Sequence, residues 1–85
     1  MRSFMYTIKA PVGMHARHAG LLVKEVGRYQ SAVTFAKDGR SVDARRILAL
    51  MGLGVKQGDL VTVTVEGEDE DVAATQLKAF LWTNF

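Results

Sequence analysis

The 85-residue chain has no cysteine, one proline and two histidines. Without cysteine it forms no disulfide and has no thiol nucleophile, and two histidines are too few for a standard structural zinc site, so we expect no metal. The longest apolar stretch, residues 47–55, is nine residues long, contains two glycines and is too short to span a membrane. The first six residues lack the apolar block of a secretory signal. These absences predict a cytoplasmic protein.

The length and composition predict one domain over residues 1–85, and hydrophobic residues make up 48% of the chain. The net charge of +2 hides an asymmetry: residues 1–56 hold ten of the eleven Lys and Arg against three acids, whereas residues 57–85 hold one Lys against six acids. Two interpretations stay open: small domains often show uneven charge along the chain, or the basic part attracts phosphate or acidic partners. Nucleic acid is not an expected partner, because no aromatic-rich RNA-binding motif or helix-turn-helix pattern is present and the last third is acidic.

The spacing of apolar residues predicts seven elements. Alternating patterns predict strands at residues 4–9, 31–37, 40–43 and 60–67, with Asp38-Gly39 as a two-residue hairpin turn. Helical spacing predicts helices at residues 16–28 and 47–53, and a last helix that begins near the acids at 68–71. Near the end of the chain, Trp82 and Phe85 are expected to pack in the core or at its edge. The order implies an α+β fold with an antiparallel or mixed sheet covered on one side by helices.

Residues 13–17 (GMHAR) place a single imidazole at the mouth of the first predicted helix. There His15 is surrounded by backbone N–H groups without intrahelical partners, at the positive end of the helix dipole, which is a natural anion site. Arg17 adds a permanent cation with a planar fork of donors suited to phosphate oxygens. The motif predicts a nucleophilic His15 beside a phosphate cradle built from Arg17 and the backbone of Ala16, Arg17 and His18.

This motif, residues 47–55 (ILALMGLGV) and the QGD turn at 57–59 together resemble the histidine-containing phosphocarrier (HPr) family of the bacterial phosphoenolpyruvate-dependent sugar phosphotransferase system. The resemblance covers nearly the whole chain, including its length and order of elements. It implies an open-faced β-sandwich, βαββαβα, with a four-stranded antiparallel sheet and three helices on one face.

The resemblance also implies a function. His15 would accept a phosphoryl group on Nδ1 from enzyme I and pass it to a IIA domain of a sugar permease, with Arg17 stabilising the group. Such a carrier holds a transient phosphohistidine, is not a turnover enzyme and needs no cofactor. It acts as a monomer and meets membrane permeases only through the IIA protein. In agreement, the chain has no Walker-type glycine loop for a nucleotide.

Two positions depart from the family pattern. His18 stands where family members usually have proline, and we interpret it as a structural or solvent-facing substitute rather than a second phosphoacceptor. Arg46 stands where members regulated by an ATP-dependent kinase have serine, which predicts no such regulation at this position. These departures keep a second hypothesis open, an HPr-like regulatory protein that binds partners without relaying phosphate.

The apolar helix at 47–53 is too short to bury all its large side chains against one core, so part of it should remain exposed. We expect this surface to dock partner proteins, and Leu48 and Met51 are its best candidates. The complete predicted docking set is Met14, Gly20, Ile47, Leu48 and Met51.

Overall fold

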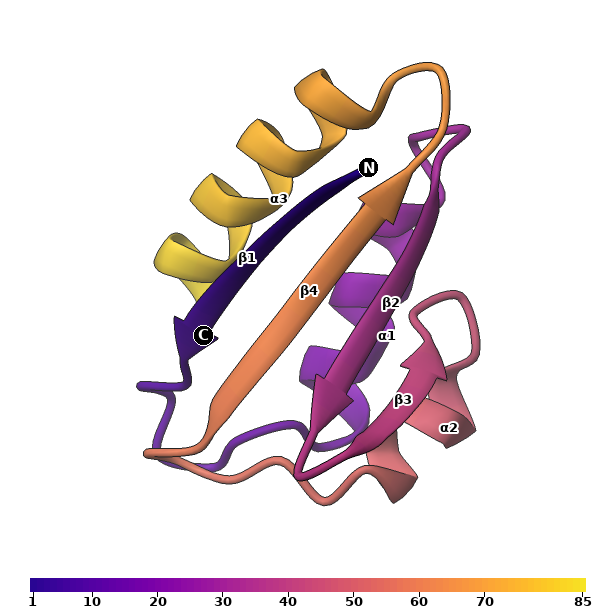
Figure 1. Cartoon of the computed structure of the whole chain (residues 1–85). Helices are drawn as coiled ribbons and strands as arrows, with labels where there is room; N and C mark the ends of the chain where they lie inside the picture. Colours follow the sequence, from indigo (N-terminus) through magenta and orange to yellow (C-terminus); the bar gives the residue numbers. More distant parts are fainter.

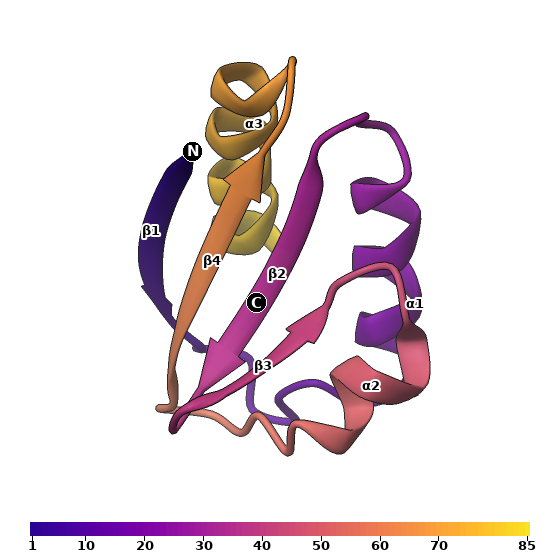
Figure 2. The same ribbon diagram turned by 45° about the vertical axis from the view of Figure 1, so that its right-hand side comes forward.

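The computed structural model describes residues 1–85 and consists of one four-stranded antiparallel sheet and three helices. Figures 1 and 2 show the three helices on the same face of the sheet, which leaves the other face open. This confirms the predicted α+β open-faced sandwich. The strands are β1 (Arg2–Thr7), β2 (Ala32–Lys37), β3 (Arg40–Asp43) and β4 (Leu60–Glu66), and the helices are α1 (Ala16–Val26), α2 (Ile47–Gly52) and α3 (Glu70–Asn84).

The strands lie in the order β1-β4-β2-β3, so the last strand of the sequence is inserted between the first and the second. The strand pairing shows this position of β4, since Val63 lies opposite Phe4 of β1 on one side and opposite Phe35 of β2 on the other. Strand β4 therefore pairs on both edges along its length, which explains why its alternation of valine and threonine is the most regular in the chain.

The core lies between the sheet and the helices. The valines of β4 at 61, 63 and 65 are fully buried, whereas the threonines at 62 and 64 lie half-buried on the open face. A buried hydrogen bond also connects the sheet to α3, because the hydroxyl of Tyr6 on β1 donates to the carbonyl oxygen of Leu81 at 3.0 Å. Alternation along the strands thus puts one apolar face under the helices, as the sequence predicted.

The predicted hairpin turn is confirmed between β2 and β3. Asp38 has φ of 50° and Gly39 has φ of 79°, and Lys37 pairs with Arg40 across the turn. Positive φ at both central positions is the requirement of a type I′ turn.

The first strand was predicted two residues too late, because it spans 2–7 rather than 4–9. Beyond Thr7 the chain leaves β4, and the N–H groups of Lys9 and Ala10 donate to the carbonyl oxygen of Phe85 at the end of α3. Ile8 is still buried, with 1% of its surface exposed. The alternation of apolar and polar residues therefore continues beyond Thr7, although the backbone there no longer pairs with β4.

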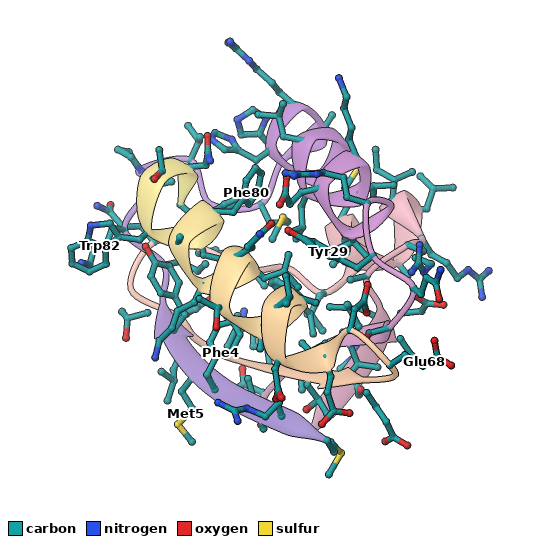
Figure 3. All side chains as sticks on the ribbon, turned by 90° about the horizontal axis from the view of Figure 1, so that it is seen from above. Phe4, Met5, Tyr29, Glu68, Phe80 and Trp82 are labelled. Atoms are coloured by element: carbon teal, nitrogen blue, oxygen red, sulfur yellow. The ribbon has the colours of Figure 1, made fainter.

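The expected packing of Trp82 was wrong. Its side chain is 70% exposed and points away from the core in Figure 3, whereas Phe80 points toward α1. The ammonium of Lys9 lies 3.6 Å from the centre of the Trp82 ring, which is a cation–π contact at the surface. The expectation for Phe85 is confirmed, because only 3% of this residue is exposed.

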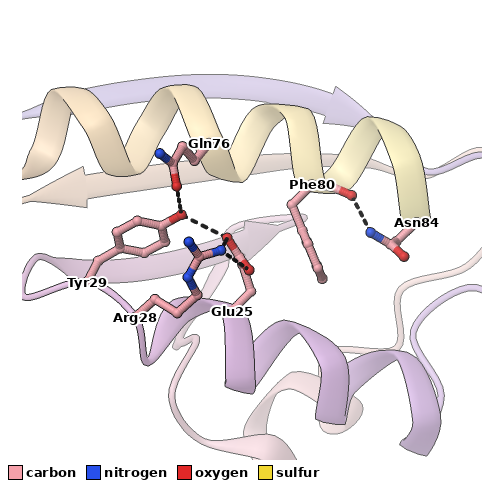
Figure 4. Close-up of polar contacts among 6 residues, drawn as sticks. All are labelled: Glu25, Arg28, Tyr29, Gln76, Phe80 and Asn84. Atoms are coloured by element: carbon pink, nitrogen blue, oxygen red, sulfur yellow. Dashed lines mark hydrogen bonds and ion pairs between the residues drawn. The ribbon is translucent and has the colours of Figure 1, made fainter.

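A small polar cluster joins α1 to α3 (Figure 4). The hydroxyl of Tyr29, just after α1, lies 2.8 Å from Oε2 of Glu25 and 2.7 Å from Oε1 of Gln76 on α3. Arg28 also pairs with Glu25, at 3.1 Å. Burial and the hydrogen bond to Glu25 raise the pKa of Tyr29 to about 12.

Within this fold, none of the helices combines the length and the apolar character needed to cross a lipid bilayer.

Candidate functional site

His15 is the N-cap residue of α1. Its backbone is extended, with φ of −102° and ψ of −178°, and its carbonyl oxygen accepts the helix hydrogen bond from Ala19 N at 2.8 Å. Ser, Thr, Asp and Asn are the usual residues at this position, because their short side chains bond to the free N–H groups of the first turn. An exposed imidazole takes their place here, so the cap position carries a side chain with a different chemistry.

The loop before α1 is held against the segment that follows α2. Gly13 has φ of 63°, and a Cβ atom on it would lie 2.4 Å from the carbonyl oxygen of Val55. The next residue, Met14, donates its N–H to this same oxygen at 3.1 Å. Only glycine allows this close approach at this φ, and the contact sets where the chain enters the helix and presents His15.

The first turn of α1 offers backbone donors around Nδ1 of His15. Arg17 N donates to Nδ1 at 3.4 Å, a long hydrogen bond, while the N–H groups of Ala16 and His18 have no partner within the chain. The Arg17 side chain is exposed and makes no ion pair. The predicted site residues His15 and Arg17 thus meet at one helix start, where free amides, a free guanidinium and the helix dipole all favour an anion.

The other ring nitrogen of His15 has a partner that the sequence analysis missed. Nε2 of His15 lies 2.9 Å from Nδ1 of His18, and the two rings are nearly perpendicular, at 89°. His18 is half-buried and its ring packs on Phe85, with 5.0 Å between ring centres. The spacing of three residues on a helix was the available signal, because such residues are neighbours on its surface.

The environment of His18 lowers its pKa below the usual value for histidine. Burial is the main cause, and the charges of His15 and Arg17 act in the same direction. The lowered pKa favours the uncharged form of His18 at neutral pH. The interpretation of His18 as a structural or solvent-facing residue is incomplete, since it contacts the predicted nucleophile directly.

The predicted docking residues separate into two groups. Ile47, Leu48 and Met51 are 39%, 79% and 36% exposed, so apolar side chains of α2 do reach the surface. Gly20 on α1 adjoins them, because a Cβ atom on it would lie 3.8 Å from Cδ1 of Ile47. Met14 differs: it is only 6% exposed and belongs to the core, so it offers almost no surface for docking.

Leu21 on α1 is 42% exposed and was not singled out from the sequence. It directly follows Gly20, which lies next to Ile47, and helices α1 and α2 are in contact. Its position in the helical pattern resembled that of a core residue, since Leu22 beside it is fully buried.

Arg46 is the N-cap residue of α2. It is exposed, with φ of −108° and ψ of 103°, and its side chain makes no capping hydrogen bond. A cation at the positive end of a helix is unfavourable, and the free N–H groups of the first turn stay uncapped. A serine at this position, which the resemblance implies for kinase-regulated members, would supply a hydroxyl and a favourable cap that Arg46 lacks.

No three His, Cys, Asp or Glu side chains lie close enough together to hold a metal ion. The pair of His15 and His18 has no third ligand beside it.

These features define a class of protein: a small open-faced sandwich that presents one exposed imidazole at a helix start suited to anions. Comparison with known proteins agrees. Residues 2–82 match the family model described as the PTS HPr component phosphorylation site. The chain belongs to the HPr family, the phosphocarrier family of the phosphotransferase system.

Individual relatives show how close the similarity is. The phosphocarrier protein HPr of Buchnera aphidicola subsp. Baizongia pistaciae is 40% identical over 76 residues, which are 89% of each chain. The crystal structure of HPr from Thermoanaerobacter tengcongensis superposes with a TM-score of 0.94 at 35% identity, covering 100% of this chain and 96% of that one. Crh from Bacillus subtilis, a domain-swapped dimer in its crystal structure, has a TM-score of 0.78 at 38% identity, covering 94% and 92%. The family thus includes phosphocarriers and the related Crh proteins.

Proposed function

We propose that this chain carries a phosphoryl group on His15, which it accepts from phosphoenolpyruvate-charged enzyme I and passes to the IIA domain of a sugar permease. The observation that carries the proposal is the exposed His15 imidazole, whose Nδ1 faces the first-turn amides of α1. The chain is then a carrier with a transient phosphohistidine and not a turnover enzyme. The exchange takes place in the cytoplasm, and contact with the membrane permease is made through the IIA protein.

The geometry suits both states of such a carrier. In the free state Nδ1 of His15 accepts a backbone N–H, so its lone pair points toward the mouth of the helix. When Nδ1 attacks phosphorus, the N–P bond forms while the bond to the donor breaks. The Arg17 N–H is then released to bind a phosphoryl oxygen, together with the unpaired N–H groups of Ala16 and His18. The free guanidinium of Arg17 stabilises the dianion.

The partners bind next to this site. The exposed apolar side chains of α2 and Leu21 form a surface beside the start of α1, and Arg17 and Arg46 add positive charge near it. A complementary partner has an apolar patch bordered by acidic residues, which favours binding and fast association. One domain supplies the imidazole and the other completes the in-line arrangement, so a monomer is sufficient.

Phosphorylation in vitro tests the proposal. Incubation with enzyme I and phosphoenolpyruvate should add the mass of one phosphate per chain, and the group should be acid-labile and base-stable. His15→Ala should abolish the modification, whereas the fold measured by circular dichroism should not change, because His15 is exposed. A wild-type chain that stays unmodified with several enzyme I proteins would contradict the proposal.

The docking surface has its own test with a matched control. Leu48→Ala should weaken binding to enzyme I by about tenfold, since truncating a central apolar contact costs more than 1 kcal/mol. Leu60→Ala removes an equally apolar side chain that is 53% exposed on β4, away from α2, and should leave binding unchanged. Equal effects of the two substitutions would show that partners bind elsewhere.

A second candidate function is regulation through partner binding without phosphate relay. The similarity to Crh favours it, and the departures of His18 and Arg46 from the family pattern leave room for it. In that case the same surface binds a partner, and His15→Ala leaves both binding and its regulatory effect intact. Pull-down of the partner with wild-type and His15→Ala chains, each measured with and without phosphoenolpyruvate and enzyme I, separates the two functions.

A further inference from the structure

The contact between the two imidazoles has no part in the mechanism described above. Nε2 of His15 lies 2.9 Å from Nδ1 of His18, which is within hydrogen-bond distance. Proline, the residue that family members usually have at this position, has no side-chain acceptor. The contact is therefore a feature of this chain, and it reaches the ring nitrogen opposite the one proposed to carry phosphate.

The hydrogen bonds of His15 determine which nitrogen holds its proton. A backbone N–H is only a donor, so the bond from Arg17 N requires Nδ1 of His15 to be an acceptor. The neutral ring must then carry its proton on Nε2, and Nε2–H donates to Nδ1 of His18. The opposite arrangement would put a proton on Nδ1 of His15, and two N–H groups would face each other there.

The ring of His18 is held in place by Phe85. Its ring packs on Phe85, and the Phe85 carbonyl oxygen accepts hydrogen bonds from Lys9 and Ala10, which fixes that residue against the loop before α1. The charges that act on His18 are those of Arg17 and, when it is protonated, His15, both on its own helix, and the Phe85 ring packs on it. Burial and these charges lower the pKa of His18, so Nδ1 keeps the lone pair that the bond requires.

We propose that His18 is a positioning residue for phosphoryl transfer: it accepts the Nε2–H of His15 and so keeps the lone pair of His15 on Nδ1, aimed at the incoming phosphoryl group. This inference rests on the proposed function, because it assumes that Nδ1 of His15 is the phosphoacceptor. In other proteins a nucleophilic or metal-binding imidazole is oriented by a group that hydrogen-bonds its second ring nitrogen, and His18 has this place here.

The step balances without a further reactant. Nδ1 of His15 donates its lone pair to phosphorus, and the bond between phosphorus and the donor breaks with its electron pair left on the donor. The phosphorylated ring keeps its proton on Nε2 and carries a positive charge, which the hydrogen bond to His18 stabilises. On transfer to the next protein the N–P bond breaks, its electron pair returns to Nδ1, and the original neutral pair is restored.

The direct test is ¹⁵N NMR of the unphosphorylated, uniformly labelled protein near neutral pH. We expect the ¹⁵N shift of His15 Nδ1 to be that of an unprotonated nitrogen and the shift of Nε2 to be that of a protonated one. A scalar coupling across the hydrogen bond should connect Nε2 of His15 to Nδ1 of His18. A proton on Nδ1 of His15, or no coupling at a temperature where the Nε2–H signal is visible, would overturn the proposal.

Two substitutions separate the hydrogen bond from the packing of the ring. His18→Phe keeps an aromatic ring against Phe85 but has no acceptor, whereas His18→Asn keeps an acceptor oxygen close to the place of Nδ1 and does not titrate. We expect transfer from enzyme I to slow by about two- to tenfold in His18→Phe, the range for one net hydrogen bond, and to recover to within about twofold in His18→Asn. The thermal unfolding of both variants shows whether they are folded.

The outcomes distinguish this inference from the proposed function. If the wild-type chain is phosphorylated on His15 but His18→Phe is as fast as wild type, the positioning role is refuted and the carrier function stands. If His18→Asn is as slow as His18→Phe although both are folded, the acceptor is not the relevant property of His18, and the role is again refuted. If the chain is not phosphorylated at all, the carrier function fails, and the NMR coupling still decides whether the hydrogen bond exists.

Discussion

Replacement of Gly13 by alanine tests whether the close approach of two loops presents His15. The φ of 63° is a left-handed conformation, which costs a non-glycine residue about 1–2 kcal/mol. The new Cβ would lie 2.4 Å from the Val55 carbonyl oxygen, so this oxygen must move and lose its bond from Met14 N, at about 1–3 kcal/mol. Alanine also lowers the conformational entropy of the unfolded chain relative to glycine, which offsets about 0.4–1 kcal/mol of this loss of stability. We expect a net loss of about 3 kcal/mol.

Gly39→Ala is the matched control. Gly39 also has positive φ, 79°, but a Cβ atom on it would meet nothing within 4 Å. Alanine at this position therefore has the unfavourable φ but no steric clash, and we expect the free energy of unfolding to fall by about 1 kcal/mol. The difference between the two variants, about 2 kcal/mol, measures the contact with Val55 alone.

Urea unfolding followed by circular dichroism measures both variants. With a slope of about 1 kcal/mol/M for a small domain, the midpoint should fall by about 3 M for Gly13→Ala and about 1 M for Gly39→Ala. Phosphorylation of His15 by enzyme I should be slowed only in Gly13→Ala, because this loop enters α1 and the hairpin does not. Equal midpoints would refute the reasoning, since they would show that the Val55 contact adds nothing to the backbone cost.

Two further predictions concern stability. Because the pKa of Tyr29 is raised from 10 to about 12, the free energy of unfolding should not depend on this group below pH 10 and should fall as the pH rises toward 12, by up to about 3 kcal/mol. Tyr29→Phe should flatten this alkaline decline in chemical unfolding, while Tyr6→Phe should retain most of it. Arg46→Ser should stabilise the protein by about 0.5–2 kcal/mol, because serine caps α2.

Arg45, the neighbour of Arg46, provides the control for the Arg46→Ser prediction. Arg45 donates to the carbonyl oxygens of Tyr29 and Ser31, so Arg45→Ser should destabilise the chain in the same urea experiment. A less stable Arg46→Ser variant would show that Arg46 has a stabilising contact instead of an unfavourable position at the helix start. For tyrosine, an undiminished alkaline decline in Tyr29→Phe would show that other groups cause it.

Local signals in the sequence predicted most of the elements and the centre of the site. The alternation of Val and Thr in β4, the Asp38-Gly39 turn and the order of strands and helices follow from periodicity and turn chemistry, which depend on residues close in sequence. The position of His15 at a helix start beside Arg17 follows in the same way, since the turn before it and the apolar spacing after it are both local. The structure confirms these elements and places the two residues together.

The sequence by itself thus determined the fold class, the helix start that bears His15 and the presence of excess apolar surface on α2. Only the tertiary structure decided that β4 lies in the middle of the sheet, that Met14 is core while Trp82 is surface, and that His18 rests on Phe85 and bonds to His15. The physical reason is that periodicity shows which face of an element is apolar but not which distant segment will cover it. His18 and Phe85 are 67 positions apart, and their contact exists only because α3 ends against the loop that precedes α1.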